Sequence, residues 1–164
     1  AVEDRRAQWH MIGHIQRRKA PRLIGIADLV HSIDSVRLAE WISKAAVEAG
    51  EILPVLVQVN TSGEESKAGF QGSDLSDEIL GVLTLPGLEV RGLMTMAPFT
   101  SDEAILRRTF ERVRILDEEL RAFEGYCGDH LSMGMTNDFE IAIEEGSTMI
   151  RIGTALFGKR MNHD

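Results

Sequence analysis

The sequence predicts an α/β fold built on a parallel sheet, because short apolar runs alternate six times with longer amphipathic stretches along its 164 residues. Alternation of this kind favours parallel strands joined by right-handed crossovers. The run at 53–60 is almost continuously apolar, which is typical of a strand covered on both faces. A doubly wound open sheet and an eight-stranded barrel both fit this pattern, and six strands are two short of a closed barrel.

Each element is predicted from its local pattern. The strands are expected at residues 9–13, 29–33, 53–60, 90–97, 130–134 and 149–152. Between them lie a weakly helical stretch at 16–27, a helix capped by Ser35 and ended by Gly50, and a helix over 74–84. The longest helix follows a capping box of Thr100 and Glu103, and a last helix lies between Asn137 and Gly146.

The composition excludes some classes of function. A net charge of −8 argues against a surface for nucleic acid or anionic membranes, which needs clustered cations. The short basic run Arg17, Arg18 and Lys19 is typical of a solvated helix face. No apolar run approaches the ~20 residues of a membrane helix. Cys127 is the only cysteine, which fits a reducing cytoplasm, and no composition break divides residues 1–164 into two domains.

Two neighbouring strand ends carry the residues of an anion site. The last strand ends in Arg151-Ile152-Gly153-Thr154, where glycine lets backbone N–H groups approach an anion and the threonine hydroxyl adds a donor. The strand before it ends in 131–138, with Ser132 and Thr136. The N–H groups of a helix beginning there add further donors. Consecutive parallel strands open on the same rim, so the two loops together predict a phosphate site; the bland alternative is a turn and a helix cap.

The other motifs are weaker evidence for a functional site. His10 and His14 are four residues apart, but a strand running into a loop gives that spacing no metal-binding meaning, and no metal is expected. Lys67 lies in the polar loop 60–70, on the rim where barrel active sites form, although a loop lysine is usually solvated. No catalytic residue can be named.

Taken together, these motifs resemble the pyridoxal phosphate homeostasis protein family, whose fold is a barrel like the N-terminal domain of alanine racemase. The resemblance is carried, in order, by residues 9–19, 60–67, 92–95, 132–135 and 151–158. It implies an α/β (β/α) TIM-type barrel, here the last six of eight βα units, that binds pyridoxal 5'-phosphate (PLP). Carried over, Ser132, Thr136, Gly153 and Thr154 bind the phosphate, and Arg151 faces the pyridine nitrogen.

The sequence departs from the family in three ways. The Schiff-base lysine of the first strand and an asparagine motif of the second are not found, and Thr136 stands where a serine is usual. The four lysines, Lys19, Lys44, Lys67 and Lys159, have no first-strand context. We therefore expect an N-terminally truncated form, PLP bound non-covalently at best, and a carrier in PLP homeostasis without catalysis.

Two alternatives stay open. One is a fragment of a racemase-like PLP enzyme that transforms amino acids. The other is a remnant that does not bind PLP, or that pairs with a separately supplied N-terminal half. The family resemblance implies a monomer, whereas two open sheet edges invite self-association.

Overall fold

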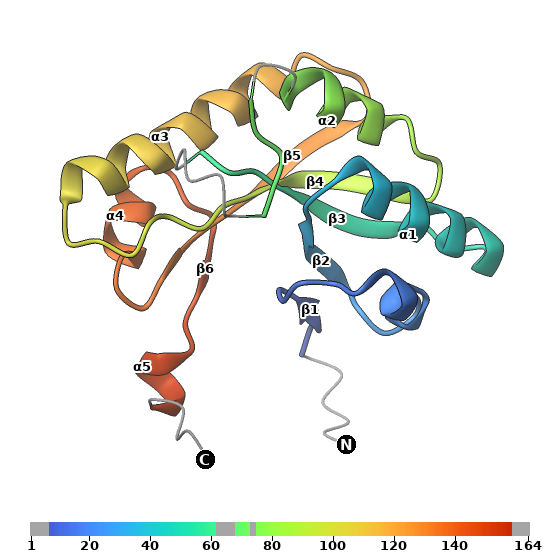
Figure 1. The fold of residues 1–164 in the computed structure, drawn as a ribbon, viewed down its shortest axis with the longest axis horizontal. Helices are drawn as coiled ribbons and strands as arrows, with labels where there is room; N and C mark the ends of the chain where they lie inside the picture. The colour runs from blue at the N-terminus through green and yellow to red at the C-terminus, as the bar shows by residue number, and fades with distance from the viewer. Residues whose placement is uncertain (1–6, 62–67, 73–74, 159–164) are drawn as a thin grey trace.

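Six parallel strands form one sheet in the computed structural model, which describes residues 7–61, 68–72 and 75–158 (Figure 1). The strands follow chain order and each pairs with the next: β1 (His10–Met11), β2 (Leu29–Ile33), β3 (Leu53–Gln58), β4 (Leu88–Met94), β5 (Tyr126–Met135) and β6 (Met149–Arg151). A doubly wound sheet reverses its strand order at a switch point, and this sheet does not. The order therefore identifies a curled half-barrel.

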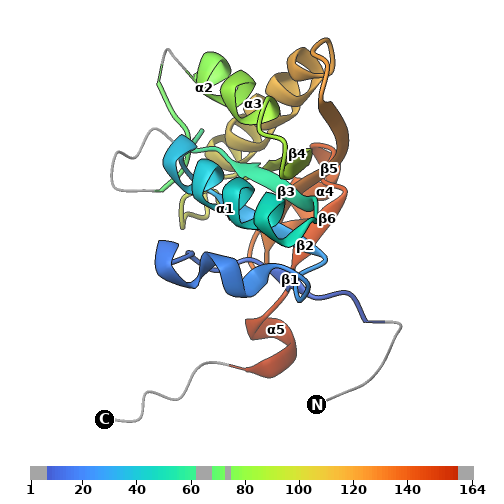
Figure 2. The ribbon, with the colours of Figure 1, turned by 90° about the vertical axis from the view of Figure 1, so that its right-hand side faces the viewer.

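Helices connect the strands and cover the outer, convex face of the sheet. They are the 3₁₀ helix η1 (Arg17–Leu23) and the α-helices α1 (Val36–Ala49), α2 (Leu75–Leu83), α3 (Glu103–Leu120), α4 (Phe139–Glu144) and α5 (Thr154–Phe157). Figure 2, turned by 90°, shows α1, α2 and α3 on one side of the sheet and α5 beyond the end of β6. The predicted helix at 16–27 is thus a shorter 3₁₀ turn that contains Pro21, which has no N–H for an α-helical bond.

The main core lies between the sheet and these helices. It joins alternate strand side chains such as Val30 and Val57 with the apolar stripe of α3, in which Phe110 and Val113 are fully buried. Each such side chain contributes about 1.5–3 kcal/mol on burial. The concave face holds a much smaller apolar cluster, consisting of Leu29, Leu56 and Met94 with Met149 against them. The concave face is therefore available for polar side chains.

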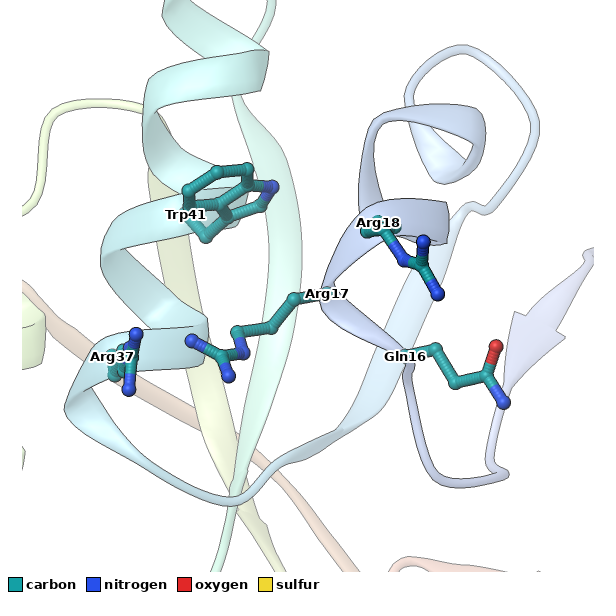
Figure 3. A pocket seen from close by; sticks show the side chains of 5 residues that line it. All are labelled: Gln16, Arg17, Arg18, Arg37 and Trp41. Carbon is teal, nitrogen blue, oxygen red and sulfur yellow. The ribbon is translucent and has the colours of Figure 1, made fainter.

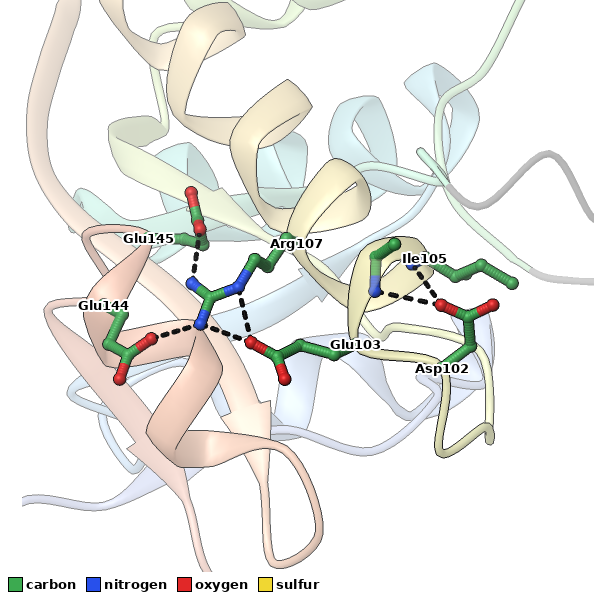
Figure 4. Close-up of polar contacts among 7 residues, drawn as sticks. Asp102, Glu103, Ile105, Arg107, Glu144 and Glu145 are labelled. Carbon is green, nitrogen blue, oxygen red and sulfur yellow. Dashed lines mark hydrogen bonds and ion pairs between the residues drawn. The ribbon is translucent and has the colours of Figure 1, made fainter.

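The longest helix begins two residues later than its predicted cap requires. Asp102, not Thr100, is the N-cap of α3, and its carboxylate accepts hydrogen bonds from the N–H groups of Ala104 and Ile105 at 2.9 and 3.2 Å (Figure 4). A charged cap also complements the positive end of the helix dipole, which explains the preference for aspartate. Thr100 instead accepts a bond from the N–H of Asp102. The predicted capping box is therefore wrong.

Helix α4, which follows strand β5, is tied to α3 by one arginine. Arg107 donates from α3 to Glu145 at 2.9 Å and to Glu144, and it also binds Glu103 on its own helix (Figure 4). These carboxylates raise the pKa of the Arg107 guanidinium. Glutamates at the C-terminal end of a helix oppose its dipole, so the arginine offsets an unfavourable arrangement. These contacts fix the position of α4, the helix that follows the 131–138 segment.

No helix in the described part of the chain combines the length and the apolar composition that crossing a membrane requires.

Candidate functional site

A polar layer lies on the concave face of the half-barrel, toward the carboxyl ends of the strands. It contains His10 on β1, His31 on β2, Ser132 on β5 and Arg151 on β6. His31 and Arg151 stand two residues after Leu29 and Met149 of the small concave cluster, and Ser132 pairs in register with Met94 and Met149. Since alternate residues of a strand share a face, His31 and Arg151 lie on the concave face, one layer closer to the rim than that cluster.

Arg151 is the cation of this layer. Its guanidinium donates to the carbonyl and the hydroxyl of Ser132 and to the carbonyl of Thr95, each at 2.8 Å. No carboxylate of the described chain forms an ion pair with it. Burial lowers the pKa of the guanidinium, and the charge of Asp138 acts in the opposite direction. An arginine with so high an ordinary pKa stays protonated, so the site holds a partly buried positive charge.

His31 continues the layer from Ser132 to His10. Its Nδ1 lies 2.9 Å from the Ser132 hydroxyl and its Nε2 lies 3.0 Å from His10 Nδ1. The two imidazole ring centres are 5.1 Å apart. His31 is only 1 % exposed, and its pKa is lowered to about 3 by burial and by the charges of His10, Arg151 and His130. The imidazole is therefore neutral at ordinary pH.

Arg151 sets the direction of the hydrogen bonds that join these four side chains. A guanidinium only donates, so the oxygen of Ser132 accepts from Arg151 and its O–H is free to donate to His31 Nδ1. A neutral His31 that accepts at Nδ1 carries its proton on Nε2 and donates to His10 Nδ1. The four side chains thus form one relay of donors that starts at the cation and holds Ser132 and Arg151 in place.

The two predicted loops lie at the same edge of the sheet. Strand pairing joins Met135 of β5 to Arg151 of β6, so Thr136 and Ile152 each follow directly at the carboxyl ends of neighbouring strands. Neither Thr136 nor Thr154 uses its hydroxyl in a hydrogen bond within the described residues. Thr154 is exposed and Thr136 is partly exposed. Both hydroxyls are therefore available to a ligand.

Gly134 and Gly153 of these two loops have different surroundings. A Cβ atom at Gly134 would lie 2.6 Å from the Cβ of Ala142, so this glycine lets α4 pack on β5. Around a Cβ at Gly153 there is no atom within 4 Å, so packing does not require glycine there. Without a side chain, the backbone at Gly153 is open to close approach by a ligand.

The structure brings the five predicted site residues into two adjoining groups. Ser132 and Arg151 are in direct contact, while Thr136, Gly153 and Thr154 lie at the rim beyond them. The sequence prediction missed His31 and the carbonyl of Thr95. A histidine and a serine inside the apolar run 29–33 were a signal, because buried polar groups need partners, but the sequence could not show which strand supplies them.

The two histidines of the 9–19 segment lie apart. His10 belongs to the polar layer, whereas His14 is exposed and its Nδ1 lies 3.2 Å from an Asp34 carboxylate oxygen. Within 7–61, 68–72 and 75–158 no three side chains of histidine, cysteine, aspartate or glutamate are grouped to hold a metal. Lys67 and Lys159 lie outside the described residues. Lys19 and Lys44 are on η1 and α1, on the outer face.

Nearly the whole chain matches known protein sequences. The family model described as the alanine racemase N-terminal domain matches residues 1–161. The pyridoxal phosphate homeostasis protein of Aquifex aeolicus is 42 % identical over 160 residues, which is 98 % of this chain and 70 % of that protein. The human protein of the same name is 38 % identical over 161 residues, 93 % of this chain and 58 % of its own.

Solved structures with the same fold range from 41 % to 17 % in sequence identity to this chain. PipY of Synechococcus elongatus, solved with PLP bound, is 34 % identical with a TM-score of 0.82, over 92 % of this chain and 70 % of that one. A protein of unknown function from Bifidobacterium adolescentis is 41 % identical with a TM-score of 0.86, and this chain covers 60 % of its length. Alanine racemase of Clostridium difficile, 17 % identical with a TM-score of 0.75, shares the fold.

Proposed function

We propose that this chain, which belongs to the pyridoxal phosphate homeostasis protein family, binds PLP at the rim loops after β5 and β6. The observation that carries the proposal is the cation at the floor of that rim. Arg151 is partly buried without a carboxylate partner, and its Nε–H group has no acceptor within the described residues, none of which has a fully buried side-chain donor without a partner. The Nε–H group is therefore accessible, and a guanidinium suits a ligand with an acceptor nitrogen and negative charge.

The residues present fit both ends of PLP. The Thr136 and Thr154 hydroxyls and the backbone at Gly153 provide donors for a phosphate dianion at the rim. Arg151 donates to the pyridine nitrogen, and a donor that stays protonated keeps that nitrogen unprotonated. When bound, PLP supplies an aldehyde that reacts with primary amines. An unprotonated ring is a weak electron sink, which favours carriage of the cofactor over amino-acid chemistry.

We further propose that residues 1–164 form one barrel-type domain that carries PLP in the cytoplasm and acts in PLP homeostasis. The single cysteine, Cys127, supports a reducing compartment. Self-association through the sheet edges is countered by their short length, since β1 has 2 residues and β6 has 3. Short edge strands and an inward charge are features of protected edges.

Removal of either rim hydroxyl tests the phosphate site. In the variants Thr136→Val and Thr154→Val we expect PLP affinity to fall about tenfold each, because a hydrogen bond to a charged group contributes about 1.5 kcal/mol or more. Equilibrium dialysis against PLP measures the change. Thr84→Val is the matched control, since its hydroxyl binds the Gly81 carbonyl on α2, away from the rim. Unchanged affinity in both rim variants would contradict the proposal.

Covalent attachment gives a second test. The two lysines of the described residues, Lys19 and Lys44, lie on outer helices, and Lys44 is beside Glu48 on the surface. None of the four lysines lies in the first-strand context that the family resemblance implies, so we expect PLP to be held without a covalent bond to this chain. Borohydride reduction of the protein mixed with PLP, followed by mass spectrometry, should return the unmodified mass. One stoichiometric adduct on a single lysine would refute this expectation.

A further inference from the structure

The second site lies on the outer face, between η1 and the start of α1. A groove of about 520 Å³ is lined there by Gln16, Arg17, Arg18, Arg37 and Trp41 (Figure 3). Its size suits a small ligand, because such pockets commonly hold about 300–1,000 Å³. None of its residues belongs to the polar layer or the rim loops, so the groove is separate from the proposed PLP site.

Three of the four unpaired arginines of the described residues line this groove. Seven of the eleven arginines in the described part of the chain have a hydrogen-bond or ion-pair partner: Arg91, Arg107, Arg108, Arg112, Arg114, Arg121 and Arg151. The four without one are Arg17, Arg18, Arg22 and Arg37, and three of these line the groove. In a chain of net charge −8, carboxylates are plentiful. Their exclusion from one groove leaves a local positive potential.

The position of Arg37 adds to that potential at a cost to the helix. Arg37 stands in the first turn of α1, which contains no acidic residue. Cations at a helix N-terminus oppose the helix dipole, whereas an anion there is stabilised by it. The Asp34 carboxylate, which precedes the helix, is contacted by His14 and Ser35. An unfavourable charge kept without a compensating partner is a feature of functional sites.

Trp41 provides a flat apolar surface beside these cations. It is one helical turn after Arg37, so both side chains lie on the same face of α1. Its side chain is 49 % exposed, and no guanidinium of the described chain stacks on the indole. Figure 3 shows Arg17 and Arg37 turned toward each other with Trp41 beside them. An exposed indole next to two adjacent guanidinium groups suits a ligand in which a planar ring is joined to phosphate.

We propose that this groove binds a nucleoside 5'-diphosphate, with its phosphates on Arg17 and Arg37 and its base on Trp41. Two phosphate groups match the several guanidinium forks, which bind phosphate oxygens in pairs. The volume leaves space for a base and a sugar beside them. The inference does not depend on PLP binding at the rim.

The experiment uses Trp41 as its own reporter. The Trp9→Phe variant leaves one tryptophan, and adenosine diphosphate (ADP) is titrated while indole fluorescence is recorded. We expect saturable quenching and at least about tenfold weaker binding in Arg17→Gln and in Arg37→Gln. Arg22→Gln is the matched control, an unpaired arginine of η1 outside the groove, and it should bind as before. No saturable quenching, or equal affinity in the groove variants, would overturn the proposal.

Three further ligands separate the parts of the proposal. Pyrophosphate tests the cations alone and should bind more weakly than ADP; equal binding would remove the role of the base. Adenosine tests the ring alone, and binding as tight as that of ADP would remove the role of the arginines. PLP also joins a ring to a phosphate, and tighter binding than ADP at Trp41, retained in Thr154→Val, would overturn the nucleotide as occupant. ADP affinity unchanged in Thr154→Val separates this groove from the rim.

Discussion

Replacement of Arg151 by methionine should abolish measurable PLP binding while most of the fold remains. Methionine has a similar length but no donor, so the ligand loses its charged partner. Hydrogen bonds to a charged group contribute about 1.5–3 kcal/mol each. The loss of the pyridine contact and of the relay that places Ser132 together predicts a decrease in affinity of about a hundredfold or more. Equilibrium dialysis measures it.

The stability of the same variant should fall as well. The carbonyl of Thr95 loses its donor, whereas that of Ser132 keeps the Thr95 N–H, and both residues are at most 1 % exposed. A buried acceptor left without a partner costs about 1–3 kcal/mol. Urea unfolding should therefore show a decrease of about 1–3 kcal/mol. Near-native circular dichroism at zero urea would show that weaker PLP binding is not simply unfolding.

Two further variants test whether the loss of affinity is specific to the Arg151 guanidinium. Arg151→Lys keeps the charge but cannot form the forked contact to Ser132 and Thr95, so its PLP affinity should lie between those of the wild type and the methionine variant. Arg91→Met removes an arginine paired with Glu89 and Asp129 on the surface, and should leave PLP affinity unchanged. Wild-type affinity in Arg151→Met would remove the basis of the proposed function.

The strands could be predicted from sequence because burial on both faces leaves a plain apolar run. The second strand was predicted at its observed bounds, 29–33, and the helix from Ser35 to Gly50 has the expected caps. The cap of α3 could not be chosen, because Thr100, Ser101 and Asp102 are all good N-cap residues. That choice depends on where the preceding chain leaves the sheet, which is a tertiary property.

The candidate site was predictable only in part, for a related reason. Loops at the ends of β5 and β6 follow each other in sequence, so their shared edge follows from parallel pairing alone. His31 is 101 residues from Ser132 and four strands away from Arg151 in the sheet order. It reaches them because the sheet curls, and no local pattern specifies that curvature.

The stability of the protein should fall as the pH decreases from 7 to 5, because of His31. Its folded pKa of about 3 is below the ordinary value of 6.5, so the unfolded chain binds the proton first. The neutral imidazole therefore contributes stability that is complete above pH 6.5 and is lost as the pH falls toward the folded pKa. One such group changes stability by about 1.4 kcal/mol per pH unit within that window.

The variant His31→Asn isolates this contribution. The asparagine side chain can accept the bond from Ser132 in place of Nδ1 but does not titrate. Between pH 7 and pH 5, most aspartates and glutamates stay ionised. Wild-type stability should drop by about 2 kcal/mol more than that of the variant across this interval. Urea unfolding at the two pH values gives both numbers.

The control for this comparison is Thr84→Val, which removes a hydroxyl that binds the Gly81 carbonyl on α2. It should keep the wild-type pH dependence, because it leaves His31 and its contacts unchanged. Equal slopes in wild type and His31→Asn would mean that His31 takes up its proton in the folded state without cost. The donor relay from Arg151 through Ser132 would then be wrong, since a protonated His31 would point a second donor at the serine oxygen that Arg151 already occupies.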